Sequence, residues 1–344
     1  MDLAATRTKW DEETVPSSIA PLRRSPRYRG AARAFAASLS TAVMLSALGC
    51  GGSSGGGSTT AAALVGSCPA DFEPQVGENR GFPSDRAERV FHLLLPDEPI
   101  AEPRPLFVSL TGTVQREVDF AAQSGLDHLP RDGWIVAAPV RTCSQNGTTC
   151  AQIGTDGRIW EPWYDGTIAG PSDDEGPDVR FVEAMVRCIS ARWPVDSARI
   201  FVGGISAGGS FTNRNLTFNS DLFAGGVASS GNWYGGLAAP ASPRPMDRSL
   251  AILIWGGPSD VWPLVNPISN YDPETKQASI YYAAQPEVAT ISCSGDHGHI
   301  WPAAMTPWLA STLLAHAKGT PAEDLVLTDP PDGFACVVGA YTDH

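Results

Sequence analysis

Short apolar runs alternate with amphipathic stretches along most of the chain. Runs of large and β-branched apolar residues, bounded by glycine, proline or polar residues, predict buried strands at 90–96, 106–111, 134–139, 199–202, 223–229, 251–255 and 289–293. Apolar residues at helical spacing predict helices over 119–129, 177–193 and 302–318, and Asp178 stands where a helix N-cap is expected. Strands that alternate with helices form βαβ units, so the pattern predicts an α/β protein with a mostly parallel sheet covered on both faces.

One strand leads into a turn suited to carry a nucleophile. The strand 199–202 is followed by Gly204, Ser206 and Gly208 in a G-x-S-x-G arrangement, and a polar, helix-capable stretch comes next. In a nucleophile elbow the serine sits on a strained strand-to-helix turn, and glycines two residues to either side remove steric collisions. The arrangement predicts an α/β-hydrolase fold with Ser206 as the nucleophile. A glycine-rich turn with an inert serine is the alternative.

A serine nucleophile needs an acid and a base, which follow it in that order along the chain in this fold. The turn after the strand 251–255 carries Asp260, our candidate acid, and Asp296 is its competitor. The loop after the last predicted strand carries His297 and His299. The residues themselves leave the choice between these two bases open.

Two backbone N–H groups are expected to receive the negative charge that develops on the substrate oxygen. One belongs to Ala207, directly after the nucleophile, and the other to Thr113, in the loop after the strand 106–111. This chemistry needs neither a metal ion nor an organic cofactor. The cysteines show none of the spacings typical of zinc sites.

The N-terminal part of the chain differs from the rest in charge. Its first 66 residues hold seven basic and four acidic residues, whereas the whole chain has a formal net charge of −13. A basic segment, a short apolar run over 34–48 and Ala-Leu-Gly-Cys ending at Cys50 are typical of a bacterial lipoprotein signal, in which Cys50 is lipidated. An ordinary cleaved secretory signal is the alternative.

These features predict a signal peptide (1–49), a flexible Gly/Ser linker (50–66) and an α/β-hydrolase catalytic domain (67–344). We expect a secreted protein or a periplasmic or outer-surface lipoprotein of a bacterium, attached to the membrane only through a lipid on Cys50. The acidity argues against nucleic acid as a partner. The six remaining cysteines predict three disulfides, and the short loop between Cys143 and Cys150 favours that pair.

Several segments together resemble secreted esterases of the polyhydroxybutyrate depolymerase and feruloyl esterase group of α/β-hydrolases. The segment V-D-S-A-R-I-F-V-G-G-I-S-A-G-G at 195–209 is similar to their nucleophile segment. G-H-I-W-P at 298–302 resembles their Gly-His-x-Trp-Pro motif, and G-G-P-S-D at 256–260 resembles their acid-bearing turn. The resemblance implies His299 as the base. Thr111 departs from it, because the group has histidine at that position.

The resemblance implies a secreted serine esterase that works through an acyl-enzyme on a triad of Ser206, His299 and Asp260. Feruloyl or acetyl esters of plant polysaccharide are the first substrate hypothesis, and a polyhydroxyalkanoate or related polyester is the second. A non-catalytic carbohydrate-binding surface lipoprotein and an acyltransferase are the alternatives. Aromatic residues in predicted loops are candidate contacts for an ester substrate, polymeric or not: Trp160, Trp163, Trp233 and Trp262.

Overall fold

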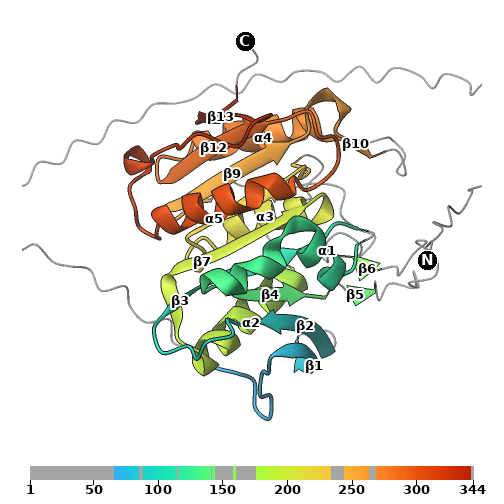
Figure 1. Cartoon of the computed structure of the whole chain (residues 1–344), viewed down its shortest axis with the longest axis vertical. Coiled ribbons are helices and arrows are strands. Elements are labelled where there is room, and N and C mark those ends of the chain that lie inside the picture. Colours follow the sequence, from blue (N-terminus) through green and yellow to red (C-terminus); the bar gives the residue numbers. More distant parts are fainter. Residues whose placement is uncertain are drawn as a thin grey trace, which may run out of the picture. The chain divides into compact units, whose positions relative to one another are not determined.

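A nine-stranded sheet forms the centre of the structure, a computed structural model that describes residues 66–84, 88–113, 115–140, 142–143, 158–159, 176–233, 244–262 and 269–341. In chain order its strands are β1 (Gly77–Pro83), β2 (Glu88–Leu94), β3 (Arg104–Leu110), β4 (Ile135–Pro139), β7 (Val195–Ile205), β8 (Gly225–Ser229), β9 (Ser249–Trp255), β12 (Val288–Ser294) and β13 (Ala335–Val338). Across the sheet they lie in the order β1-β2-β4-β3-β7-β8-β9-β12-β13 (Figure 1).

The six central strands, from β4 to β12, pair in parallel, and the outer strands pair antiparallel. All seven strands predicted from apolar runs belong to this sheet, so the prediction of a mostly parallel sheet is confirmed. Short strands form two separate ribbons in the described ranges. They are β5 (Thr142–Cys143) with β6 (Arg158–Ile159), and β10 (Val261–Trp262) with β11 (Ser269–Asn270).

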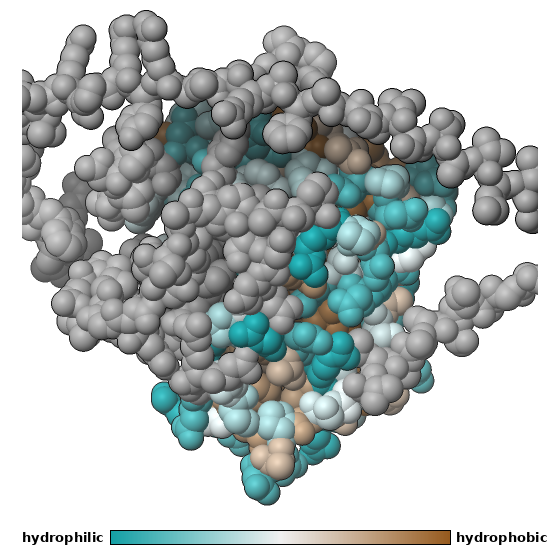
Figure 2. Space-filling model, turned by 180° about the vertical axis from the view of Figure 1, so that it is seen from behind, coloured by the Kyte–Doolittle hydropathy of each residue, from teal (hydrophilic) through white to brown (hydrophobic). Residues whose placement is uncertain are grey.

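Helices cover both faces of the sheet (Figure 1). The helices α2 (Pro177–Arg192), α3 (Ala207–Phe218) and α4 (Tyr271–Ala283) pack on one face, and α1 (Glu117–Ser124) and α5 (Thr306–Ala315) pack on the other. Each face has its own buried apolar cluster, because alternate residues of a strand point to opposite sides. The view from behind shows hydrophilic side chains interspersed with apolar ones on the described surface (Figure 2).

Two predicted helices are interrupted. Gly125, at φ 75°, ends α1 and begins the 3₁₀ helix η1 (Leu126–Asp132), so the helix expected over 119–129 is two elements. The one expected over 302–318 is the short η4 (Ala303–Met305) followed by α5. Two further single-turn elements are η3 (Gly257–Ser259) and η5 (Ala322–Asp324).

The predicted helix cap at Asp178 is wrong. The N-cap of α2 is Gly176, which has no side chain to form a cap. The Asp178 side chain is fully buried and forms an ion pair with Arg89 of β2, which is itself 3% exposed. The carboxylate that local spacing assigns to the helix end is therefore paired with an arginine of a distant strand.

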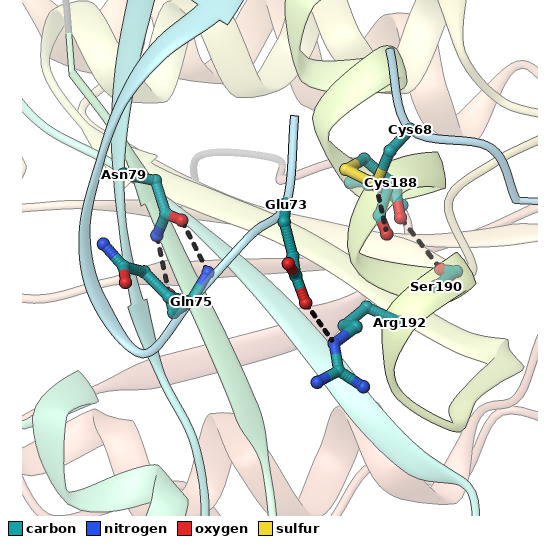
Figure 3. Close-up of a disulfide and its surroundings, with 8 residues drawn as sticks. Cys68, Glu73, Gln75, Asn79, Cys188, Ser190 and Arg192 are labelled. Atoms are coloured by element: carbon teal, nitrogen blue, oxygen red, sulfur yellow. Dashed lines mark hydrogen bonds and ion pairs between the residues drawn. A yellow bond between two sulfur atoms is a disulfide. The ribbon is translucent and has the colours of Figure 1, made fainter. Parts of the chain in front are cut away.

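Among the described residues, two disulfides join segments that are far apart in sequence. Cys68 is bonded to Cys188 of α2, and an ion pair between Glu73 and Arg192 lies nearby (Figure 3). Cys293 of β12 is bonded to Cys336 of β13. The predicted pair of Cys143 with Cys150 lies outside the residues whose side chains are described. Within the described ranges, no helix has the length and apolarity needed to cross a membrane.

Candidate active site

Ser206 occupies the sharp turn between β7 and α3. Its backbone has φ 59° and ψ −120°, a conformation in which L-residues are strained, and its N–H donates to Ser229 O at 2.9 Å. A Cβ added at Gly204 or at Gly208 would lie 2.1 Å from the carbonyl oxygen of Leu110. The two glycines of the motif are therefore required by the close approach of β3 to this turn.

Asp260 and His299 are hydrogen-bonded to one another. Asp260 follows η3 at the carboxyl end of β9 and is fully buried, and its Oδ1 lies 2.7 Å from His299 Nδ1. The loops that carry them are packed closely, since Gly298 N–H donates to Gly256 O at 3.3 Å. A carboxylate on Nδ1 orients the imidazole and leaves Nε2 as the nitrogen available to a nucleophile.

Ser206 and His299 line one pocket at the carboxyl end of the central strands. Its volume is about 70 Å³, and its other lining residues are Gly112, Thr113, Gln115, Ile205 and Trp262. The Trp262 ring lies 5.4 Å from the His299 ring, between centroids. Parallel α/β sheets place their ligand sites at this end of the strands.

Tyr271, the first residue of α4, also belongs to the site. Its hydroxyl lies 3.4 Å from Ser206 Oγ, and its ring stacks on His299 with centroids 4.3 Å apart. No hydrogen bond joins Ser206 Oγ to the His299 ring in the described part of the chain. Catalytic hydrogen bonds are often long before substrate binds and shorten in the reacting complex. No sequence motif marks Tyr271, so sequence reasoning missed it.

The expected oxyanion donors lie at this pocket or beside it. Ala207 begins α3, where backbone N–H groups lack acceptors within the helix, and Thr113 lines the pocket. The neighbouring Gly112 N–H donates to Gln115 Oε1 at 3.2 Å. That bond ties the loop after β3 into a turn that faces Ser206.

The competing histidine and acid lie apart from this arrangement. Burial lowers the pKa of His297, and within the described residues neither ring nitrogen has a hydrogen-bond partner. Its ring packs on Phe334, with centroids 5.3 Å apart. Asp296 accepts a hydrogen bond from Ser259 Oγ at 3.4 Å rather than from a histidine. Asp260 therefore bonds His299 and leaves His297 unbonded.

Of the four tryptophans proposed to contact substrate, the structure describes Trp233 and Trp262. Trp262 lines the pocket, whereas Trp233 is 7% exposed and packs on Tyr281 and Tyr282. Trp233 is therefore a core residue here, and the structure does not support its role in binding substrate. Trp160 and Trp163 lie outside the described residues, as does Cys50.

Similar proteins are known, although no family model matches the chain. The chain is 36% identical over 325 residues to the oxidized polyvinyl alcohol hydrolase of Sphingopyxis sp. (strain 113P3), covering 81% of this chain and 89% of that protein. The oxidized polyvinyl alcohol hydrolase of a Pseudomonas species is 36% identical over 325 residues, covering 80% and 86%. The crystal structure of native sOPH matches with a TM-score of 0.71 and 34% identity, over 81% of this chain and 98% of that one.

The match over most of both chains confirms the predicted α/β-hydrolase fold. The narrower resemblance to polyhydroxybutyrate depolymerases and feruloyl esterases is not confirmed by these relatives and stays a prediction.

Proposed function

The chain belongs to the oxidized polyvinyl alcohol hydrolase family, and from this membership we propose that it is a serine hydrolase acting through an acyl-enzyme on Ser206. The observation that carries the proposal is the pocket lined by both Ser206 and His299, together with the 2.7 Å bond from His299 Nδ1 to Asp260. In this proposal Ser206 is the nucleophile, His299 the base and Asp260 the acid.

In the proposed reaction, Ser206 Oγ attacks a substrate carbonyl carbon while His299 Nε2 takes its proton. The backbone N–H groups of Ala207 and Thr113 stabilise the oxygen that becomes negative. The tetrahedral species collapses as His299 returns the proton to the leaving group. Water then attacks the acyl-enzyme, again with His299 as base, and releases the acid and free Ser206.

Two substrate classes fit this chemistry. The names of the relatives describe the hydrolysis of oxidized polyvinyl alcohol. One methylene carbon separates neighbouring hydroxyl-bearing carbons of polyvinyl alcohol, so oxidation of two neighbours gives a 1,3-diketone. After Ser206 attacks one carbonyl carbon, the bond from that carbon to the methylene carbon breaks, and the enolate of the other ketone leaves and takes the proton from His299. A carboxylic ester presents the same kind of electrophile to Ser206, so feruloyl or acetyl esters of plant polysaccharide and polyhydroxyalkanoate polyesters belong to the same proposal. All of them place a carbonyl group in a pocket of about 70 Å³.

A substrate panel with four variants tests the proposal. We expect the protein to hydrolyse chromogenic short-chain esters and one or more of oxidized polyvinyl alcohol, feruloyl esters and polyhydroxybutyrate. Ser206→Ala should lower turnover by on the order of a thousandfold or more, and His299→Gln and Asp260→Asn should also be strongly impaired. His297→Gln is the matched control and should keep near wild-type turnover.

Hydrolysis that persists in Ser206→Ala, or that is lost in His297→Gln and kept in His299→Gln, would overturn these assignments. Carbohydrate binding without any turnover would favour a non-catalytic surface protein. Diversion of product to an added alcohol would favour an acyltransferase.

We also propose that the protein is exported and that Cys50 carries a lipid. The basic and apolar segments before Cys50, and the Gly/Ser stretch after it, support this proposal. Labelling with a radioactive fatty acid in a bacterial host tests it. The wild-type protein should take up label and Cys50→Ala should not, and an unlabelled wild-type protein in the culture medium would indicate a cleaved signal instead.

A further inference from the structure

Ser230 stands directly after β8 in a conformation that suits glycine better than serine. It is fully buried and has φ 48°. Only Asp71, Ser206 and Ser230 combine a side chain with a positive φ in the described part of the chain. Such strained residues persist where the surrounding structure or a function demands them.

The hydroxyl of Ser230 explains why serine is present despite the strain. Its Oγ donates to Asp260 Oδ2 at 2.6 Å, the range of a charge-assisted hydrogen bond. Its backbone N–H donates to Ile254 O at 2.7 Å, a bond that glycine would form equally well. The contact with Asp260 is therefore the one that requires this side chain.

Each oxygen of the Asp260 carboxylate has its own partners. Oδ2 accepts from Ser230 Oγ and, at 2.9 Å, from Gly256 N–H, and Oδ1 faces His299 Nδ1. With two donors on Oδ2, the carboxylate cannot turn about its terminal torsion without losing a hydrogen bond in a fully buried site. Oδ1 is thereby held toward the imidazole.

The segment around Ser230 also contacts the nucleophile turn. Ser229 O accepts the N–H of Ser206, and a Cβ added at Gly209 would lie 3.1 Å from Gly231 Cα. Three consecutive residues thus touch the turn that carries Ser206 and the carboxylate that holds His299. A shift of this segment would move the proposed nucleophile and the proposed acid together.

We propose that Ser230 is a positioning residue for the reaction. Its hydroxyl fixes the rotamer of Asp260 and shares the negative charge of the carboxylate, which sets how strongly Asp260 stabilises a protonated His299. The proposal rests on the function proposed above. Ser230 does not line the pocket, so it acts on the chemical step and not on substrate affinity.

Removal of the hydroxyl should lower kcat by about tenfold and leave KM within about twofold of wild type. Charge on Asp260 would be less dispersed, so protonated His299 would be favoured and the acidic limb of kcat/KM should move to higher pH. The ionisable residues Asp260 and Tyr271 contact the His299 ring, and neither is changed by these variants.

Two variants and a control separate positioning from a structural role. Ser230→Ala removes the hydroxyl and keeps a Cβ at the strained position, and Ser230→Gly removes the hydroxyl and relieves the strain. Ser249→Ala is the control, because Ser249 is a buried serine of the neighbouring strand β9 whose Oγ has no hydrogen-bond partner among the described residues. We expect both Ser230 variants to lose kcat and shift the pH profile, with the Tm of Ser230→Gly at or above wild type.

A wild-type kcat and pH profile in both Ser230 variants would overturn the proposal. So would a loss of kcat in Ser230→Gly that comes with a lower Tm and an unshifted pH profile. The low-field proton NMR signal of the His299 Nδ1–H reports on the same contact without any substrate. A shift of this signal in Ser230→Ala supports the positioning role whether or not the protein turns over a substrate. Absence of Ser206-dependent turnover in the wild-type protein would count against the proposed function and not against the contact between Ser230 and Asp260.

Discussion

The ring of Tyr271 lies flat on the imidazole of His299, with centroids 4.3 Å apart and ring planes 18° apart. The backbone N–H of Tyr271 donates to Asp260 O at 3.0 Å, and its hydroxyl lies 3.4 Å from Ser206 Oγ. One residue therefore contacts the proposed nucleophile, base and acid. The stacking contact is close, whereas an O–H···O distance of 3.4 Å is well beyond the usual range for this bond.

We therefore expect the ring of Tyr271 to contribute more to activity than its hydroxyl. Tyr271→Leu removes the surface on which His299 rests and should lower kcat by about tenfold, since small losses of catalytic geometry are costly. Tyr271→Phe keeps that surface and should stay within about threefold of wild type. Steady-state kinetics on a chromogenic ester measure both.

Tyr281, on the same helix, supplies the control, and Tyr281→Phe should leave kcat and KM unchanged. A Tyr271→Phe protein as impaired as Tyr271→Leu would show that the hydroxyl carries the effect, contrary to this prediction.

The second prediction concerns Gly208, which follows the turn that carries Ser206. Alanine is favoured over glycine in a helix by about 1 kcal/mol, so Gly208→Ala in α3 would be stabilising if propensity decided. The added Cβ would lie 2.1 Å from Leu110 O, a contact that forces β3 and the turn apart. We expect a loss of about 2–4 kcal/mol in the free energy of unfolding, together with loss of activity. Urea denaturation measures the first, and a Gly208→Ala protein as stable as wild type would contradict it.

Much of this arrangement follows from sequence because its signals are short and continuous. Apolar runs mark the buried central strands, and Gly204, Ser206 and Gly208 stand at a recognisable spacing, although the atoms that require the two glycines belong to Leu110 of the distant strand β3. The elements that sequence reasoning missed lack such signals. The edge strand β1 has only two fully buried positions, β13 has none, and α4 has no strong apolar stripe. Tyr271 reaches the site because α4 begins there, which depends on contacts formed only in the folded chain.

The disulfide between Cys293 and Cys336 should stabilise the far edge of the sheet. It joins β12 to β13 across a sequence separation of 43 residues. Closing a loop of this length stabilises the folded state by about 4 kcal/mol in the chain-entropy account, and measured effects are often smaller. We expect the double variant Cys293→Ser with Cys336→Ser to have a lower Tm than the wild-type protein. Differential scanning calorimetry with and without reductant checks this, and an unchanged Tm would contradict it.

His316 makes stability depend on pH. Burial lowers its pKa, with Asp324 acting in the opposite direction, and burial lowers the pKa of His297 as well. Because the unfolded chain has the ordinary pKa of about 6.5, it binds protons more readily than the folded protein. This stabilising contribution is complete above pH about 6.5 and is lost as the pH falls toward the folded-state pKa.

The free energy of unfolding of wild type should therefore fall between about pH 7 and pH 5. In His316→Leu this fall should be shallower, and in His316→Leu with His297→Leu it should be shallower still. Denaturant titrations across that range provide the measurement. A slope that neither substitution changes would show that other groups control the acid sensitivity.

The buried ion pair between Arg89 of β2 and Asp178 of α2 allows a double-mutant cycle that measures how strongly the two charges stabilise the fold. Both side chains are at most 3% exposed, and the Arg89 guanidinium lies 4.2 Å from the centroid of the Phe181 ring. Removing one partner leaves the other charge buried, so Arg89→Met and Asp178→Leu should each cost about 3–5 kcal/mol of unfolding free energy. The double variant buries no unpaired charge and should lose less than either single variant. Urea titration of the four proteins completes the cycle, and additive losses would mean that the two charges do not depend on one another.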